Sequence, residues 1–208
     1  MLAKSNKYSM TDDKYIWEEF KNDKADADTL SYIYHQNIDF LFFYGKKFTG
    51  DEPFILDTVQ DLFYDLIRTR KNLGETDNIR FYLTKAFKRR LLHELKNKKR
   101  QLLVGDDFLL EPEIIFSVED DLIRNEDLTK RIKLIRRGMK ELNTKQREIL
   151  YYKFTCDFNY DQICQIMAIS YESARQLVSR AIHSLKKYLS ENNFIFMLIF
   201  NKLAFKIK

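Results

Sequence analysis

The 208-residue sequence predicts an all-α fold of two small helical domains joined by an acidic linker, with a helix-turn-helix in the second domain. Five Gly and two Pro are too few for a turn-rich all-β architecture. Tyr and Phe are plentiful and fall mostly at helical spacing. Acidic and basic residues are segregated along the chain. We expect domains at residues 12–100 and 122–191, a linker at 101–121, and an apolar tail of unassigned role at 192–208.

The charges alternate in three blocks, although the net charge is only +5. Residues 81–100 contain eight Lys and Arg against one acid, whereas residues 101–127 contain nine acids against one Arg. Residues 128–191 are basic again, with thirteen Lys and Arg against six acids. This pattern indicates a polyanion that is contacted at two places. The alternative is a set of solvated helix faces.

Two helices are expected to open the first domain. Ile16 and Phe20 indicate a short helix, with Trp17 on or near its apolar face. A longer helix is expected over residues 29–48, and Gly50 breaks it.

A third helix is expected after Asp51, which can cap it, and Pro53 is tolerated in its first turn. Apolar residues recur at i, i+3 and i+4 from Ile55 to Ile67. The other face carries Asp57, Gln60, Asp61 and Asp65. These residues form either a solvated face or a docking surface for a partner, and the spacing alone leaves both interpretations open.

A polar loop at residues 69–78 leads into a basic helix at 78–99. Phe81 and Tyr82 lie near the start of this helix, and Lys and Arg fill its second half. Such a helix suits single-stranded nucleic acid, because bases stack on aromatic rings while Lys and Arg bind phosphates. The alternative is a set of core aromatic residues beside a solvated basic edge.

Residues 101–121 fit no single helix, and a glycine, a proline and a run of acids mark them as a linker. A helix is expected to resume near residue 122 and to run to about 142. Asn143 or Thr144 then caps another helix, which is expected to reach about residue 155.

Residues 158–187 have the layout of a helix-turn-helix. Asn159 can cap the first helix, with Gln162 completing a capping box, and Ser170 can cap a second helix that starts at Tyr171. The residues expected to face inward are Ala174, Leu177, Val178, Ala181, Ile182 and Leu185. Those expected to face outward, where this motif meets a DNA major groove, are Arg175, Gln176, Ser179, Arg180 and His183. Because plain helical bundles also contain such helix pairs, this stretch alone leaves DNA binding open.

The remaining features narrow the class of protein. Cys156 and Cys164 lie in apolar patterns and are expected to be packing residues. The three His are scattered without ligand spacing, so we expect no metal site and no cofactor. The polar residues 1–10 do not form a signal peptide, which favours a cytoplasmic location.

The tail contains the apolar run FIFMLIF at residues 194–200. It is too short to span a bilayer, which needs about 20 apolar residues, so no stable membrane insertion is expected. Packing onto the second domain, contact with a partner, and contact with a membrane surface are its three interpretations.

The order of these parts resembles a bacterial sigma factor of the extracytoplasmic-function group, over most of residues 15–190. Residues 57–70 resemble the helix with which the family's first domain binds the RNA polymerase core, with the sequence DTVQDLFYDLIRTR. Residues 79–100 resemble its helix for promoter melting and −10 recognition, with the sequence IRFYLTKAFKRRLLHELKNKKR. Residues 142–189 resemble the second domain, which reads the −35 element. This last stretch is the most specific, because KQRE precedes the helix-turn-helix and its basic second helix.

The resemblance implies a dissociable, non-catalytic subunit of bacterial RNA polymerase, with promoter DNA, the polymerase core and an anti-sigma protein as partners. The residues implied for core binding are Asp57, Gln60, Asp61, Leu62 and Asp65. Those implied for the unpaired −10 strand are Arg80, Lys85, Lys88, Arg89, Arg90 and Lys96. Those implied for −35 bases are Arg175, Gln176, Ser179 and Arg180, with Arg147, Lys186 and Lys187 on phosphates.

The sequence also departs from the family pattern at four positions. These are Asn143 for a frequent Pro, Cys164 for a small Ala, Ala168 for a Gly at the tight turn, and Arg89 for an Asn used in −10 recognition. A left-handed conformation at Ala168 costs about 1–2 kcal/mol relative to Gly.

Two other classes of function stay open. One is a stand-alone helix-turn-helix regulator, with residues 1–100 as a dimerisation or effector domain. The other is a nucleic-acid enzyme, such as a nuclease with an Asp/Glu metal site. Against the enzyme, the acids of residues 57–65 lie on one helix face without a converging cluster elsewhere.

Overall fold

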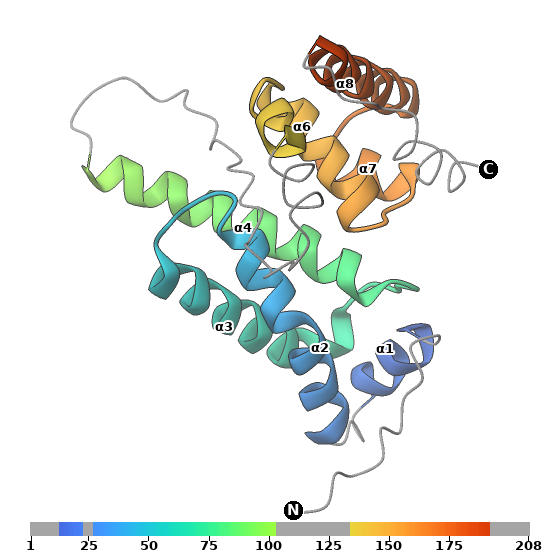
Figure 1. The fold of residues 1–208 in the computed structure, drawn as a ribbon. Helices are drawn as coiled ribbons and strands as arrows, with labels where there is room; N and C mark the ends of the chain where they lie inside the picture. The colour runs from blue at the N-terminus through green and yellow to red at the C-terminus, as the bar shows by residue number, and fades with distance from the viewer. Residues whose placement is uncertain (1–12, 23–26, 103–133, 192–208) are drawn as a thin grey trace, which may run out of the picture. The chain divides into compact units, whose positions relative to one another are not determined.

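The computed structural model describes residues 13–22, 27–102 and 134–191, and its elements within these ranges are all helical (Figure 1). The chain divides into two compact units after Pro112. The predicted all-α fold is therefore confirmed. The acidic linker beyond Leu102, the helix expected over residues 122–133 and the apolar tail lie outside the described residues.

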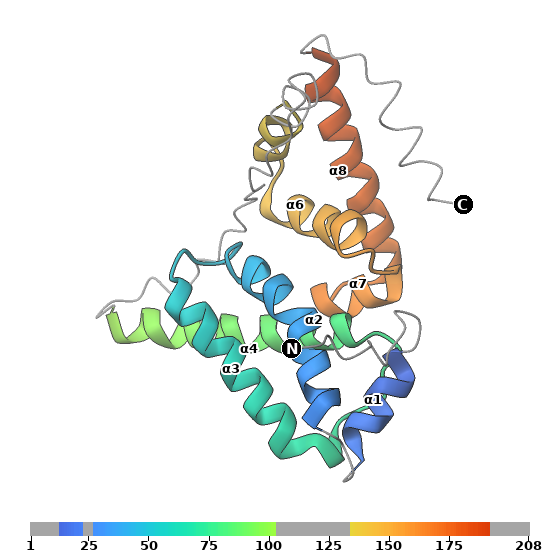
Figure 2. The same ribbon diagram turned by 60° about the horizontal axis from the view of Figure 1, so that its bottom comes forward.

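Four α-helices and one 3-10 turn are described in the first unit. They are α1 (Asp13–Lys21), α2 (Ala27–Gly45), α3 (Glu52–Thr69), the turn η1 (Arg70–Asn72) and α4 (Ile79–Leu102). Helix α3 packs against both α2 and α4, and the view of Figure 2 shows α3 and α4 inclined to each other. The core between these helices contains Ile33, Leu41, Ile55, Val59, Leu83, Phe87 and Leu91.

Helix α1 packs through its apolar face on α2, α4 and η1. Trp17 is fully buried in this face, and its ring centroid lies 4.6 Å from that of Tyr82 on α4. The sequence predicts Trp17 on or near the apolar face, and the structure makes it the largest fully buried side chain of that helix.

Helix α2 ends at Gly45, three residues before the predicted end at 48. The N–H groups of Lys47 and Phe48 donate to carbonyls only three residues back, which tightens the chain out of the α-helix. Gly45 also lies close against α3, because a Cβ at this position would come within 2.6 Å of Ile55 Cγ2. Close packing therefore ends this helix earlier than the apolar spacing indicates.

Caps define the starts of α3 and α4. The Asp51 carboxylate accepts a hydrogen bond from the Phe54 N–H, as predicted, and Pro53 lies in the first turn. The Asn78 side chain accepts from the Phe81 N–H at 2.8 Å. Asp13 of α1 adds a long-range cap, because its carboxylate accepts from the Ile79 N–H at 2.8 Å. The position of α4 is thus fixed by a residue 66 positions earlier.

The second unit is described from residue 134 to Glu191. It contains a helical segment at residues 134–140, α6 (Thr144–Leu150), the π-helical turn η2 (Tyr151–Thr155), α7 (Tyr160–Met167) and α8 (Tyr171–Glu191). One core cluster of this unit joins Met139, Leu142, Leu150, Ala181, Leu185 and Leu189.

Helix α6 is shorter than predicted. The α-helix was expected to reach about residue 155, but it ends at Leu150, so the prediction is wrong beyond that residue. The chain widens there into a π-helical turn, in which the Cys156 N–H bonds the Tyr151 carbonyl at 3.0 Å. This wider turn brings the rings of Tyr152 and Phe158 into a stack 5.9 Å apart. Both rings are fully buried, so apolar packing accompanies the irregular backbone.

Candidate nucleic-acid interface

The turn between α7 and α8 has the geometry of a helix-turn-helix. Asn159 and Gln162 form the predicted capping box at the start of α7, and the Ser170 hydroxyl accepts from the Ser173 N–H at the start of α8. Ala168 is left-handed, with φ 54° and ψ 47°, and its N–H bonds the Cys164 carbonyl. The non-glycine residue at this turn therefore carries the strain expected from the sequence.

Helix α8 separates its two faces as the 3.6-residue period predicts. Ala174, Val178, Ala181 and Leu185 are buried, with Leu177 and Ile182 half-buried. The side chains of Arg175, Gln176, Ser179, Arg180 and His183 are exposed. The face of α8 predicted to contact DNA is thus exposed on the second unit and available to a partner.

Two parallel rows run along this exposed face, because residues four apart share a side of a helix. Glu172 and Gln176 belong to one row, and the Gln176 amide donates to the Glu172 carboxylate at 2.9 Å. Arg180 continues that row, and its Nε donates to the Gln176 carbonyl at 3.4 Å. Within the described residues, neither Arg175 nor Arg180 forms an ion pair with a carboxylate.

The three residues predicted to bind −35 phosphates occupy different surroundings. Lys186 and Lys187 are exposed on the last turns of α8. Arg147 is half-buried, and its guanidinium donates to the Leu142 carbonyl at 2.6 Å and to the Lys140 carbonyl at 3.4 Å. In the structure Arg147 therefore stabilises the turn before α6 through these two hydrogen bonds. Its contact with a DNA phosphate stays a prediction.

The six residues predicted for the −10 strand point in several directions around α4. Lys85, Arg89 and Lys96 are exposed, and their spacing of four and seven residues places them on one face. Lys88 is half-buried. The Arg80 guanidinium instead lies 5.1 Å from the ring of Phe40 on α2. A single face thus contains three of the six.

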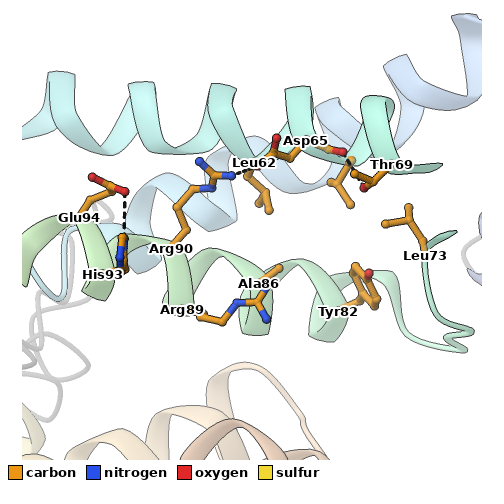
Figure 3. A pocket seen from close by; sticks show the side chains of 11 residues that line it. Leu62, Asp65, Thr69, Leu73, Tyr82, Ala86, Arg89, Arg90, His93 and Glu94 are labelled. Carbon is orange, nitrogen blue, oxygen red and sulfur yellow. Dashed lines mark hydrogen bonds and ion pairs between the residues drawn. The ribbon is translucent and has the colours of Figure 1, made fainter. Parts of the chain in front are cut away.

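Arg90 turns toward α3, as Figure 3 shows. Its guanidinium pairs with the carboxylate of Asp65 and lies 3.5 Å from that of Asp61. A second ion pair joins the same two helices, because the Lys98 ammonium lies 2.8 Å from the Asp51 carboxylate. Residues predicted for core binding and for DNA binding therefore contact each other in this unit.

The pKa of Asp51 reflects these contacts. The hydrogen bond from Lys98 holds the pKa of this carboxyl below its usual value, and the Phe54 N–H acts in the same direction. Lys98 is held from a second side by the ring of Phe54, 4.4 Å from its ammonium.

A pocket of about 410 Å³ lies between the C-terminal half of α3 and α4 (Figure 3). Its lining consists of Leu62, Asp65, Leu66, Thr69, Leu73, Tyr82, Ala86, Arg89, Arg90, His93 and Glu94. Burial raises the pKa of the Tyr82 hydroxyl, so this group remains a neutral donor near pH 7. The pocket combines apolar, aromatic and cationic surface beside the loop that precedes α4.

That loop is fastened by α1. The Trp17 indole donates to the Gly74 carbonyl at 2.8 Å, and the Lys21 ammonium lies 2.5 Å from the Glu75 carboxylate. Thr76 adds a local turn, because its hydroxyl donates to the Asn78 carbonyl and accepts from the Asn78 N–H. Side chains far apart in the sequence thus determine the path of the predicted polar loop.

The residues predicted for core binding divide by burial. Asp57, Gln60 and Asp61 are exposed, Asp65 is half-buried and Leu62 is 5% exposed. Leu56 and Ile67 fall within the predicted apolar series of this helix but are exposed, and so is Tyr64, which the sequence interpretation missed. Their spacing of eight and three residues, off the buried stripe, was the available signal. Outward-facing apolar and acidic residues therefore occur together on α3.

Within the described residues, no group of three or more His, Cys, Asp or Glu side chains could hold a metal ion. None of the described helices is both long and apolar enough to cross a membrane.

Comparison with known proteins finds a family model that matches part of the second unit. Residues 138–187 match the family model described as Sigma-70, region 4, which spans α6, α7 and most of α8. The family model thus matches the segment that contains the helix-turn-helix, and the fold of the chain is similar to that of solved sigma factors. The resemblance to sigma factors inferred from the sequence is thereby confirmed.

Two solved structures share the fold of the chain. The sigma factor RpoE of Bartonella quintana, in complex with the anti-sigma factor NepR, is 15% identical with a TM-score of 0.57 and covers 79% of this chain and 98% of its own. CnrH, in complex with the cytosolic domain of CnrY, is 12% identical with a TM-score of 0.54 and covers 86% and 97%. At such identities the likeness concerns the fold alone. No curated protein matches the sequence.

Region 4 contains every residue predicted for −35 DNA. The residues predicted for the −10 strand and for core binding lie outside the matched range. Their roles rest on the sequence resemblance and on the geometry of α3 and α4.

Proposed function

We propose that this protein is a promoter-specificity subunit that binds core RNA polymerase and directs transcription initiation at −10 and −35 promoter DNA. The observation that carries the proposal is the sigma-70 region 4, in which α8 presents exposed Arg175, Gln176 and Arg180 on a helix-turn-helix. The sigma-factor fold, which extends over most of the chain, supports a role for both units.

Recognition of the −35 element would come from α8. Arg175 and Arg180 have the geometry to bond guanine edges, and Gln176 has the amide that pairs with adenine. Each good bidentate contact contributes about 1–3 kcal/mol of discrimination. Ser179 bonds either kind of base, whereas Lys186 and Lys187 would bind phosphates, which position the helix without specifying sequence.

Capture of the unpaired −10 strand would come from α4 and the loop at residues 69–78. Lys85, Arg89 and Lys96 share an exposed face for phosphates. Lys88 flanks that face, whereas Arg80 lies on the other side of α4, against the Phe40 ring. Arg90 would reach DNA only after it exchanges its carboxylate partners on α3. This exchange links −10 capture to whatever binds α3.

Docking on the polymerase core would use α3. Asp57, Gln60 and Asp61 supply an exposed polar edge, with Leu62 and Asp65 deeper in the contact. The chain would contribute no chemistry of its own, because the polymerase core forms the phosphodiester bonds. Such a subunit would act in the cytoplasm, where the polymerase works.

An anti-sigma protein is a further proposed partner. The solved RpoE of similar fold is bound to its anti-sigma factor NepR. A protein that covers the exposed faces of α3 or α8 would keep this chain from the polymerase or from DNA.

In vitro transcription tests the proposal. The full chain is added to bacterial core polymerase on genomic DNA, and transcript start sites are mapped. Shared −10 and −35 elements upstream of new start sites are the expected result. The matched control is the Arg175→Ala/Arg180→Ala double variant, which should lose the −35 preference. Specific binding of duplex DNA by a dimer of the chain without polymerase, and without new start sites, would instead identify a stand-alone regulator.

A further inference from the structure

An exposed tyrosine stands at the leading end of the proposed reading helix. Tyr171 is the first residue of α8 and is 51% exposed. In the same unit Phe154, outside α8, is 37% exposed, whereas Tyr151, Tyr152 and Phe158 are at most 6% exposed. A large ring left in water on a DNA-facing helix needs an explanation, because its burial against a partner would be favourable.

The ring of Tyr171 is held in place by neighbouring elements. Its centroid lies 5.4 Å from that of Tyr160 on α7, at an interplanar angle of 56°. The Lys153 ammonium, from the π-helical turn η2, lies 5.0 Å from the centroid of the Tyr160 ring. Ser170 caps the turn of helix on which Tyr171 stands. Tyr160, which itself contacts Lys153, therefore limits the positions open to this ring.

Tyr171 also begins the second row of the exposed face of α8. Arg175 and Ser179 follow at four-residue intervals and complete this row. The N-terminal residues of a recognition helix are the ones that contact base edges in a helix-turn-helix complex. The ring thus stands one helical turn ahead of an arginine suited to guanine.

We propose that Tyr171 reads sequence by packing its ring against the C5-methyl group of a thymine beside the base read by Arg175, with Tyr160 and Lys153 as positioning residues. This inference rests on the proposed DNA-binding function of α8. The thymine methyl is the apolar feature of the major-groove edge, and an apolar side chain is its natural partner. A ring that is already fixed before binding loses little conformational freedom. Most of the free energy of its contact therefore contributes to the affinity.

The test uses the holoenzyme of full chain and core polymerase on a promoter mapped by transcription. Each thymine of the −35 element is replaced singly by deoxyuridine, which removes only the methyl group. Wild type should lose about fourfold in promoter affinity at one such position, the value of one buried methyl. Tyr171→Ala should bind thymine and deoxyuridine equally at that position, whereas Tyr171→Phe should retain the preference.

Controls separate the possible outcomes. Tyr15→Ala removes another exposed tyrosine, on α1, and should retain the fourfold preference. A −35 element without thymine beside the Arg175 site would overturn the inference, as would a wild-type holoenzyme indifferent to every deoxyuridine. Loss of the preference in Tyr171→Phe would show a hydroxyl contact instead and would also overturn it. If no promoter is found at all, the proposed function itself fails.

Discussion

Helix α4 and helix α8 both carry clustered cations, but their surroundings differ. On α4, Arg90 is paired with acids of α3, and Lys98 is paired with Asp51 ahead of that helix. On α8, Arg175 and Arg180 have no carboxylate in ion-pair distance among the described residues, and both side chains are exposed. The same kind of sequence thus produces a partly neutralised surface on α4, where Arg90 and Lys98 are paired, and uncompensated arginines on α8.

The two helices should differ in how far their DNA contacts depend on another partner. The face of α8 presents its charges directly and needs no rearrangement to meet phosphates. Part of α4 must first release its internal carboxylates, and a partner that engages those carboxylates would release Arg90. We therefore expect the two DNA contacts to depend differently on the polymerase core, with the −10 contact the more dependent.

The largest expected effect comes from the uncompensated surface. Arg175→Ala/Arg180→Ala should lower promoter affinity of the holoenzyme at least about thirtyfold, because two contacts worth about 1–3 kcal/mol each are lost. The free energy of unfolding should change by less than about 0.5 kcal/mol, since both side chains are exposed. Filter binding and urea unfolding measure the two quantities. Arg137→Ala/Lys140→Ala, at two exposed positions outside α8, is the charge-matched control.

Removing the Asp65–Arg90 ion pair should have a smaller effect, and this effect should appear in the free energy of unfolding of the first unit. A double-mutant cycle of Asp65→Ala and Arg90→Ala should give a coupling energy of about 1 kcal/mol, because both side chains are only partly exposed. Urea unfolding of the four chains measures it, with Asp57→Ala replacing Asp65→Ala as the control on the same helix. A coupling of zero would mean that α4 is as uncompensated as α8 in solution.

Backbone strain, unlike the paired charges, is found in the second unit. Among the described residues, the non-glycine residues with positive φ are Asp157 and Ala168, both in the second unit. Ala168→Gly should therefore raise the free energy of unfolding of that unit by up to about 1 kcal/mol, because the greater entropy of unfolded Gly offsets part of the strain relieved. Ala86→Gly, within α4, should lower that of the first unit by about 1 kcal/mol. Thermal unfolding of both variants checks the contrast, and destabilisation by Ala168→Gly would show that the turn is not strained.

The smallest expected effect is a dependence of the first unit's free energy of unfolding on pH. The pKa of Asp51 is lowered in the folded chain, first by Lys98, so its ionised form stabilises the fold above its unfolded pKa. That contribution should disappear as pH falls through the folded pKa, below the usual range of an aspartate. Asp51→Asn should flatten the acid limb of the stability profile measured by circular dichroism. Asp57→Asn is the control with the same change of charge, and equal profiles for both variants would remove the role assigned to Lys98.

The sequence predicts those features that depend on local spacing. The inward and outward residues of α8, the capping box of Asn159 and Gln162, and the cap at Asp51 follow from periodicity and from the preferences of helix ends. The structure contains each of them as predicted.

Features that depend on a distant partner were not visible in the sequence. The direction of Arg90 depends on acids 25 and 29 residues away, and that of Arg147 on carbonyls of the preceding turn. The early end of α2 depends on the packing of Gly45 against Ile55. The π-helical turn follows the stacking of Tyr152 and Phe158. Composition gives the sign of a surface, whereas tertiary contacts determine which charges remain available.

The fastening of the loop before α4 has an evolutionary consequence. Trp17 binds the Gly74 carbonyl, which every residue type supplies, and Asp13 binds the Ile79 N–H, which every type except proline supplies. The path of the loop therefore depends only partly on its own side chains, those of Glu75, Thr76 and Asn78. Substitutions at its other positions can alter what the loop touches while its course is retained. Descendants of this chain could acquire new target preferences there without first having to evolve a new scaffold.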